Sequence, residues 1–561
     1  MKSSLFFVGG LATLAHCSDL QPRVACAGNT AATRSKWCDL SIDTNYYDVV
    51  PTTGITREYY FNVEELQAAP DGYLRTVYAV NGLVPGPTIV ADWGDVVVVH
   101  VNNSLATAQN GTSIHFHGIR QNYTNQMDGV TSITQCPIAV GDVMTYVWRA
   151  TQYGSSWYHS HIGLQAWEGV AGAILINGPA TANYDVDKGT IMLSDWSHRT
   201  ADELYTVALT TGPPELDTGL INGTNVWNNT GTIVGHRFNT SFTSGQSYRL
   251  RLINGAIDTQ FKFSIDNHTM KVIAADLVPI KPYDTTVLDI SMGQRYDVVV
   301  SADQASVANN FWMRAIPQVA CSNNANTADI RGIVYYGSEP ATPTTTGYDY
   351  KDACIDEPVS SLVPYLAVDA GEQHWADLEQ VDIFNASGVF LWTLNGTSFN
   401  SSWTNPTLLQ LYNRNTNYTS DSHVIQLDEA DQWAYLIIEN QNAVPHPIHL
   451  HGHDFFILGQ GSGAYNSSNL LSLKNAVRRD VAMLSGSGYL VLAFKTDNPG
   501  AWLMHCHIGW HTNAGFALQF LEQPEVAQKL INYELLNSTC AAWSSYTTKL
   551  AIEQPTYDDG V

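Results

Sequence analysis

The chain is poor in basic residues and in charge of either sign. Among its 561 residues are 27 Lys and Arg against 52 Asp and Glu, which gives a formal net charge of −25, and charged residues make up only 14%. So negative a chain repels nucleic acids and anionic lipid surfaces, and we expect no nucleic-acid partner. After the N-terminal segment no apolar run approaches the length of a membrane span, so we expect no membrane partner.

Sustained helical periodicity is also scarce, and residues 526–536 are the best candidate for a helix. Short apolar runs bounded by Gly, Pro, Asn and Asp recur instead, for example at residues 95–101 and 172–176. The 15 Trp, 28 Tyr, 17 Phe and 42 Gly favour a β-rich architecture. Many short strands with turn signals predict an all-β chain of sandwiches or barrels, and the length suggests about two to four domains.

The N-terminus and the cysteines indicate an oxidising compartment. Residues 1–17, with Lys2 before an apolar run, have the pattern of a secretory signal peptide. Thirteen Asn-x-Ser/Thr sequons suit a glycosylated surface, so we expect a secreted, extracellular glycoprotein. Of the eight cysteines, Cys17 would leave with the signal, and Cys506 lies in a metal-binding motif. The other six predict three disulfides, whose pairing the sequence leaves open.

Four His-x-His pairs are the most informative feature, at residues 115–117, 159–161, 449–451 and 505–507. Because residues i and i+2 of a strand point to the same face, each pair can aim two imidazoles at one place. Eight imidazoles exceed the three or four ligands of a single site, so they predict a cluster of several metals. Cys506 faces the other way, and with His446 and His511 it forms the His2Cys set of a blue-copper centre.

An internal repeat relates the two ends of the chain. Residues 114–118 recur as 448–452, and residues 157–163 are echoed by 502–509. Where the second copy has Cys506, the first has Ser160, which cannot bind copper as a thiolate. We therefore expect two homologous β-domains with the paired histidines at their interface, and a middle domain that is structural or contributes to a substrate cleft. The predicted boundaries are residues 42–178, 179–350 and 365–561.

The thiolate decides between metal chemistries. Imidazoles alone could bind zinc, copper, iron or nickel, and zinc hydrolases need only three ligands and one open position. Cys506 shares a strand with His505 and His507, so a few covalent bonds join the mononuclear site to the cluster. A one-electron acceptor connected to a multinuclear site predicts the reduction of a molecule that takes several electrons, with dioxygen as the obvious candidate.

These motifs together resemble the copper-binding motifs of multicopper oxidases, and most closely those of ascomycete fungal laccases. The resemblance covers nearly the whole mature chain. It implies three cupredoxin-like Greek-key β-sandwich or barrel domains, with a trinuclear copper cluster between the first and the third. It also implies four copper ions, and one-electron oxidation of phenolic substrates coupled to the reduction of dioxygen to water. We expect a monomer.

The resemblance assigns the ligands residue by residue. Type 1 copper would be bound by His446, Cys506 and His511; type 2 copper by His115 and His449; one type 3 copper by His117, His159 and His507, and the other by His161, His451 and His505. Phe516 stands at the axial type 1 position, where these laccases more often have leucine. Because phenylalanine cannot ligate, we expect a relatively high reduction potential.

Two carboxylates and the C-terminus complete the implied site. Asp128 matches a family acid near the cluster that relays protons, although an Asp-Gly turn explains it too. Asp217 has the spacing of the substrate-pocket carboxylate, with Glu215 as its rival. Residues 559–561 partly match a family tail that plugs a channel toward the cluster. The implied disulfides are Cys26–Cys38, Cys136–Cys540 and Cys321–Cys354.

Other functions share part of this pattern. A ferroxidase, a bilirubin oxidase or an ascorbate oxidase would use the same copper sites with a different electron donor. A copper-storage protein would bind the metal without consuming oxygen, but storage does not require a thiolate joined to a cluster.

Overall fold

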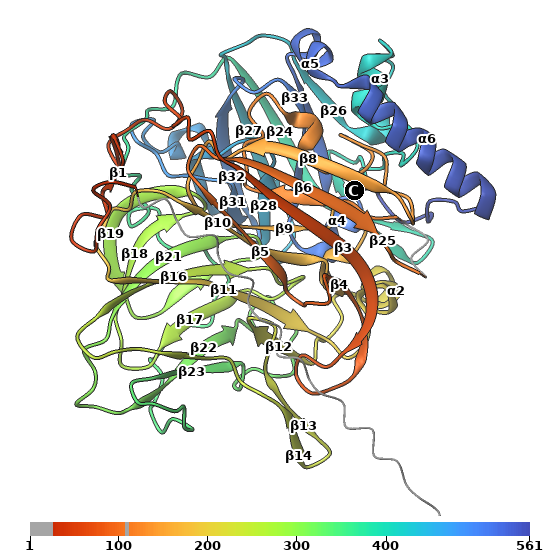
Figure 1. The fold of residues 1–561 in the computed structure, drawn as a ribbon. Coiled ribbons are helices and arrows are strands. Elements are labelled where there is room, and N and C mark those ends of the chain that lie inside the picture. Colours follow the sequence, from red (N-terminus) through yellow and green to blue (C-terminus); the bar gives the residue numbers. More distant parts are fainter. Residues whose placement is uncertain (1–25, 107–110) are drawn as a thin grey trace, which may run out of the picture.

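The structure is a computed structural model that describes residues 26–106 and 111–561. The signal peptide predicted at residues 1–17 lies outside the described residues. The described strands form eight sheets, and six of these sheets pair into three two-sheet units (Figure 1). The chain is therefore all-β in its architecture, as predicted. No helix in the described residues is both long and apolar enough to span a membrane.

The first unit contains the N-terminal histidine pairs. One sheet has the order β4-β3-β6-β8, and the other has the order β5-β10-β9-β7. Their bounds are β3 Thr56–Ala68, β4 Arg75–Val80, β5 Gly86–Asp92, β6 Val96–Asn103, β7 His115–His117, β8 Val143–Arg149, β9 Gly154–His159 and β10 Ala171–Asn177, after the small pair β1 Lys36–Trp37 and β2 Leu40–Ser41. In β6 the side chains of Val97, Val99 and Val101 are buried while their neighbours are half-buried, the period-two pattern of a strand over a core.

The second unit forms the lower part of Figure 1. Its sheets have the orders β12-β11-β16-β21-β18-β19 and β15-β23-β22-β17-β20, and the hairpin β13-β14 projects from it. The bounds are β11 Val186–Trp196, β12 Thr218–Ile221, β13 Val226–Asn229, β14 Thr232–Gly235, β15 Asn239–Ser241, β16 Ser247–Asn254, β17 Phe261–Ile265, β18 Met270–Ala275, β19 Val278–Thr285, β20 Leu288–Ile290, β21 Arg295–Ser301, β22 Asn310–Pro317 and β23 Arg331–Tyr335.

The third unit contains the other two histidine pairs. Its sheets have the orders β25-β24-β27-β32-β29-β30 and β26-β34-β33-β28-β31. The bounds are β24 Trp375–Ala386, β25 Val389–Leu394, β26 Val424–Leu427, β27 Trp433–Asn440, β28 His446–Leu450, β29 Phe455–Ser462, β30 Arg478–Arg479, β31 Val481–Leu484, β32 Gly488–Lys495, β33 Gly500–Cys506 and β34 Ala517–Glu522. One continuous hydrophobic core runs through the second and third units, so their contact is apolar and extensive.

In the described residues six α-helices of 4 to 18 residues lie between and beside the sheets: α1 Gln165–Glu168, α2 Ala201–Thr211, α3 Thr407–Tyr412, α4 Gly509–Asn513, α5 Pro524–Leu530 and α6 Tyr533–Leu550. The helix predicted at residues 526–536 is two helices, because Asn532 caps the start of α6 by accepting a hydrogen bond from Leu535 N. Helix α2 was not predicted, although Thr200 and Glu203 form a capping box at its start.

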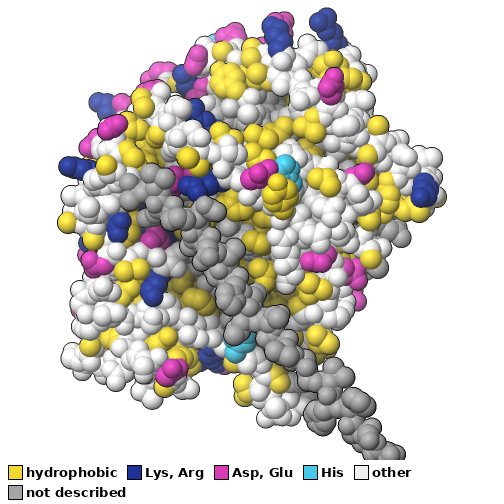
Figure 2. Space-filling model, viewed as in Figure 1, with side chains coloured by type: hydrophobic (Ala, Val, Ile, Leu, Met, Phe, Trp, Pro, Cys, Tyr) yellow, Lys and Arg dark blue, Asp and Glu magenta, His cyan; other side chains and the backbone are white. Residues whose placement is uncertain are grey.

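The three disulfides are confirmed with the implied pairing: Cys26–Cys38, Cys136–Cys540 and Cys321–Cys354. Cys136–Cys540 joins residues 404 positions apart and ties the first unit to α6. The surface agrees with the low charge fraction, because uncharged side chains dominate the face in Figure 2 and Lys and Arg stand singly on it.

Candidate metal centre and substrate cavity

The fold brings the four histidine pairs into one buried cluster between the first and third units. Within each unit a strand pairing aligns two of them, since His115 is opposite His159 and His449 is opposite His505. Across the units the ring centroids of His115 and His451 are 4.1 Å apart. All eight imidazoles have at most 5% of their surface exposed. The structure therefore brings the eight paired imidazoles together, as their spacing in the sequence predicts.

Hydrogen bonds through Nδ1 orient four of these rings and leave the Nε2 atom of each without a partner among the described residues. In four rings Nδ1 donates to a backbone carbonyl: His115 to Asp128, His159 to Ser160, His449 to Asp480 and His505 to Cys506. The Nε2 atoms of these four rings are buried without a hydrogen-bond partner in the described chain. Buried polar atoms are normally satisfied, and metal-binding histidines characteristically donate their other N–H to a carbonyl. The donor set therefore fits copper.

The ring nitrogens gather in overlapping groups of three. His161, His451 and His505 offer donor atoms within 4.8 Å of one another. His507 Nε2 lies 3.3 Å from His117 Nδ1, so these two rings face one point. These contacts agree with the two type 3 sets, and the assignment of each ring to a particular ion stays a prediction.

Burial sets the protonation of the cluster. It lowers the pKa of His505 to about 4, and it lowers the pKa of His117, His159 and His449 well below the ordinary range, with neighbouring histidines adding to the shift. Metals bind the neutral imidazole. The apolar surroundings therefore hold these rings in the metal-binding form at ordinary pH.

Two aspartates bracket the cluster in matching ways. The fully buried carboxylate of Asp128 accepts from His451 Nδ1 at 2.8 Å, and its backbone carbonyl accepts from His115. Asp480 offers its carbonyl to His449 and an oxygen 3.3 Å from His117 Nε2, while Arg295 donates to both of its carboxylate oxygens. The sequence singled out Asp128 but gave Asp480 no role, because only the fold brings it to the histidines.

A second donor set lies behind the cluster. Cys506 Sγ is 3.6 Å from Nδ1 of His446 and 3.6 Å from Nδ1 of His511, and these nitrogens are 3.1 Å apart. Burial lowers the pKa of His511 to about 3 and raises the pKa of the Cys506 thiol well above its usual range. A thiolate here needs a cation beside it. Three donors that converge in an apolar pocket fit a copper ion.

Aromatic rings close this set on its open side. The Phe516 ring is 5.0 Å from the His446 ring and fully buried, and Trp392 packs 4.3 Å from His511. Phe516 thus lies beside the Cys506 donor set, at the position predicted from the sequence to be axial, and it offers no ligand atom.

A cavity of about 470 Å³ reaches His511 from the surface. Its wall is apolar and aromatic, with Trp392 and Trp510 beside His511. Asp258 is the only acid among the described residues that line it. Burial, followed by the charge of Asp195, raises the pKa of Asp258 well above that of an ordinary carboxyl. The cavity can therefore accept an aromatic ring and offer one strong proton acceptor.

Asp217, predicted as the pocket carboxylate, does not line this cavity, and neither does its rival Glu215. Asp217 accepts hydrogen bonds from Ser197 Oγ and from the backbone N–H of His198, next to β12. The spacing from the Asn-Gly turn at residues 222–223 identified a carboxylate that supports a turn. Asp258 lies far enough along the chain from any motif that no sequence signal marked it.

The C-terminus is buried against the first unit. Val561 has 2% of its surface exposed, and its carbonyl accepts from Gly163 N at 3.1 Å, next to the pair at residues 159–161. Burial raises the pKa of Asp558 to about 7. This docking agrees with the tail predicted from the last residues, whose role as a plug stays a prediction.

Comparison with known proteins agrees with this geometry. Family models described as multicopper oxidase match residues 62–181, 187–338 and 392–526. Laccase-2 of Botryotinia fuckeliana is 46% identical, with 97% of this chain and 96% of that protein aligned, and the laccase of Cryphonectria parasitica is 40% identical over 94% and 93%.

Two solved structures extend the comparison. The crystal structure of the laccase from Botrytis aclada has a TM-score of 0.91 at 46% identity and covers 96% of this chain and 100% of its own. Fet3p, a multicopper oxidase that functions in iron import, has a TM-score of 0.77 at 25% identity, with 90% and 96% covered. Taken with the histidine cluster and the cysteine site beside it, these likenesses show that the chain belongs to the multicopper oxidase family, among its fungal laccases.

Proposed function

We propose that the chain oxidises phenols by one electron at a time beside His511 and uses the electrons to reduce dioxygen to water within the histidine cluster. When bound, one copper at His446, Cys506 and His511 would supply the one-electron acceptor, and three coppers among the eight paired histidines would supply the site of dioxygen reduction. The observation that carries this proposal is Cys506, the last residue of β33, which lies between His505 and His507 in the chain. The thiolate site and the cluster are thus joined through the backbone.

The ligand assignments form part of the proposal. Type 1 would be bound by His446, Cys506 and His511, type 2 by His115 and His449, and type 3 by His117, His159 and His507 with His161, His451 and His505. The unpartnered nitrogens of the cluster and the three converging donors around Cys506 support them. The three domains would span residues 42–178, 179–350 and 365–561, and the chain would be a monomer.

The cavity wall supports a phenolic substrate. An apolar pocket with two tryptophans accepts a planar ring, whereas ferrous iron prefers oxygen ligands and would find only the carboxylate of Asp258. Asp258, in place of Asp217, would accept the phenol proton while His511 conducts the electron. Asp128, in contact with two cluster histidines, would relay protons to the site of dioxygen reduction.

Secretion is proposed on chemical grounds. Three disulfides form in an oxidising compartment, and thirteen sequons with a signal-like N-terminus suit the secretory route.

An oxygen electrode tests the function directly. The copper-loaded protein is supplied with a dimethoxyphenol, Fe(II), ascorbate or bilirubin, and we expect the highest kcat/KM with the phenol. A higher value with Fe(II), ascorbate or bilirubin would assign a different oxidase. Bound copper without oxygen uptake from any reductant would show a storage protein.

A further inference from the structure

The loop between β16 and β17 supports the substrate cavity. It contains residues 255–260 and places Asp258 in the wall beside Trp510 and His511. Such a loop would be free to move if only its ends were fixed. In this structure it is held on three sides, and two of the three contacts involve the backbone of Ile257 or of Asp258 itself.

The first contact comes from Asp195, near the end of β11. One oxygen of its carboxylate accepts from Ile257 N at 2.9 Å, and the other accepts from Asp258 N at 2.9 Å. Asp195 is buried, with 7% of its surface exposed, and forms no ion pair in the described chain. A buried carboxylate is costly, and the two backbone N–H donors offset part of that cost, since burial still raises the pKa of Asp195.

The second contact joins the same peptide to the metal-binding segment. Ile257 accepts at its carbonyl from Gly509 N at 3.0 Å. Gly509 begins α4, which contains His511 two residues later. Hydrogen bonds therefore run without a gap from Asp195 through the backbone of Ile257 to the helix that presents His511.

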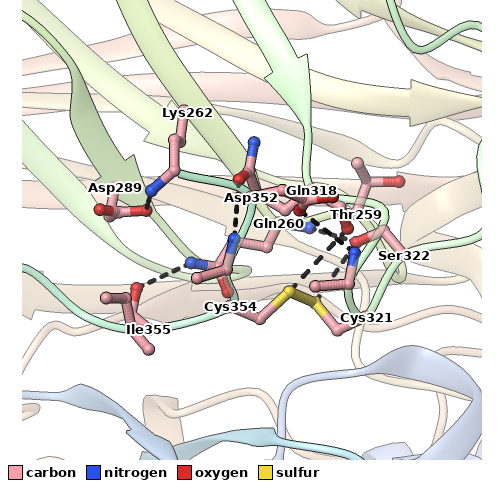
Figure 3. The surroundings of a disulfide bond; sticks show 12 residues. Thr259, Gln260, Lys262, Asp289, Gln318, Cys321, Ser322, Asp352, Cys354 and Ile355 are labelled. Carbon is pink, nitrogen blue, oxygen red and sulfur yellow. Dashed lines mark hydrogen bonds and ion pairs between the residues drawn. A yellow bond between two sulfur atoms is a disulfide. The ribbon is translucent and has the colours of Figure 1, made fainter. Parts of the chain in front are cut away.

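The third contact comes from the disulfide side, which Figure 3 shows. Gln260 N donates to Ser322 Oγ at 3.0 Å, and Gln260 Nε2 donates to the carbonyl of Ile355 at 2.8 Å. Ser322 and Ile355 stand next to Cys321 and Cys354, which form a disulfide in the cavity wall. This side holds the far end of the loop but does not contact Asp258.

From these contacts we propose that Asp195 is a positioning residue for phenol oxidation, which fixes the Asp258 carboxylate at the distance from His511 that a bound phenol requires. The proposal rests on the proposed function. A phenol must place its hydroxyl against Asp258 and its ring edge against His511 at once, so the spacing of these groups sets the rate. A donor without a proton to lose needs only His511.

Asp195→Asn separates these two demands, because one of its two acceptor oxygens becomes an amide nitrogen that faces a backbone N–H. We expect kcat/KM for 2,6-dimethoxyphenol to fall about tenfold while that for ferrocyanide stays within about twofold. The dissociation constant of 4-nitrophenol, measured by calorimetry, should rise, while copper content and blue absorption stay unchanged. Asp195→Glu keeps the charge but displaces the loop, and we expect the same split, which covers the case that Asp195→Asn does not fold.

Asp187→Asn is the matched control, because Asp187 lies on the same strand and pairs with Arg251 away from the cavity. It should lower stability without separating the two substrates. Equal losses with phenol and ferrocyanide in both Asp195 variants would overturn the positioning role. If the unaltered protein fails to oxidise the phenol at all, the proposed function fails instead, so the two failures are distinguishable.

Discussion

The two copies of the repeat differ at three corresponding positions, and these decide which copy can bind a mononuclear metal. Counted from the shared motifs, Thr112, Ser160 and Gln165 of the first unit correspond to His446, Cys506 and His511 of the third. In the first unit Thr112 Oγ1 and Ser160 Oγ both donate to Gln165 Oε1, at 2.5 and 2.8 Å.

The same backbone is therefore closed by neutral hydrogen bonds in one copy and lined with converging metal donors in the other. Gly163 and Gly509 are a further pair of corresponding residues whose hydrogen-bond partners differ. Gly163 donates its N–H to the C-terminal residue Val561, whereas its counterpart Gly509 donates to Ile257 in the loop that carries Asp258. The first copy is sealed by the end of the chain, and the third opens onto a substrate cavity. The two copies thus share a backbone but differ in role, because equivalent residues form hydrogen bonds with different partners.

The largest effect should come from exchanging the thiol. Cys506→Ser removes the only thiolate donor in the described centre, so we expect loss of blue absorption and of oxygen uptake with a phenol to below detection. The matched change Ser160→Ala in the first copy should leave both within about twofold, because it removes one hydrogen bond from a copper-free site. Retention of full activity by Cys506→Ser would reject the assignment of the mononuclear site.

Asp258→Asn tests the role of the cavity carboxylate beside the third unit. We expect kcat/KM for a phenol to fall about a hundredfold, with ferrocyanide much less affected. Because burial raises the pKa of Asp258, its proton-accepting form appears only as pH rises, so phenol oxidation should increase with pH along an acid limb. Asp258→Asn should lose that limb. Asp217→Asn, which removes the carboxylate predicted from the sequence, should leave it in place. The reverse result would restore Asp217 as the pocket acid.

The mononuclear donor set can also be introduced into the first unit. The triple variant Thr112→His, Ser160→Cys and Gln165→His supplies the donor set of the third unit on the corresponding backbone of the first. We expect about one additional copper per chain and stronger blue absorption, measured by metal analysis and visible spectroscopy. No additional copper in a folded triple variant would show that these three side chains are not sufficient to build the site.

The smallest effect concerns the seal at the first copy. Burial raises the pKa of Asp558 from 3.8 to about 7. A raised carboxyl pKa contributes stability that is fully present below pH 3.8 and is lost as pH rises through about 7. Docking of the tail should therefore be tightest in acid.

We expect Asp558→Asn to raise the Tm at pH 8 by about 2 °C relative to the unaltered chain and to leave it nearly unchanged at pH 4, as followed by calorimetry. Limited proteolysis should release the tail of the unaltered chain faster at pH 8 than at pH 4. Equal differences in Tm at both pH values would remove the role of this carboxyl.

Much of the metal centre could be predicted from the sequence because its signals are local. His-x-His in extended backbone puts two rings on one face, and an intervening Cys506 faces the other way. Only the first pair lies wholly on a strand, because the second histidines of the others follow the ends of β9, β28 and β33. The all-β architecture followed from the short runs because those signals are local too. The cavity had no such signal, because Asp195, Asp258 and Gly509 meet only through contacts over long sequence separations.

Loops account for the remaining differences. Asp217 was placed in the pocket by its spacing from the turn at residues 222–223, but spacing does not decide toward which side of a sheet a loop turns. Hydrogen bonds from Ser197 and His198 hold this carboxylate away from the cavity. Helix α2 had readable signals that the sequence prediction passed over, since a capping box at Thr200 precedes apolar residues at helical spacing, at positions 201, 204, 205, 208 and 209.

The bond between Cys136 and Cys540 makes most of the polypeptide a closed ring. Three of the four histidine pairs lie within that ring, and the fourth, at residues 115–117, lies on the segment that precedes Cys136. A protease that cuts any exposed loop between the two cysteines converts the ring into two pieces that remain covalently attached. Both halves of the histidine cluster then stay in one molecule, and the disulfide rather than dilution limits their separation. The two pieces of a nicked chain would therefore reassociate without having to meet a second molecule.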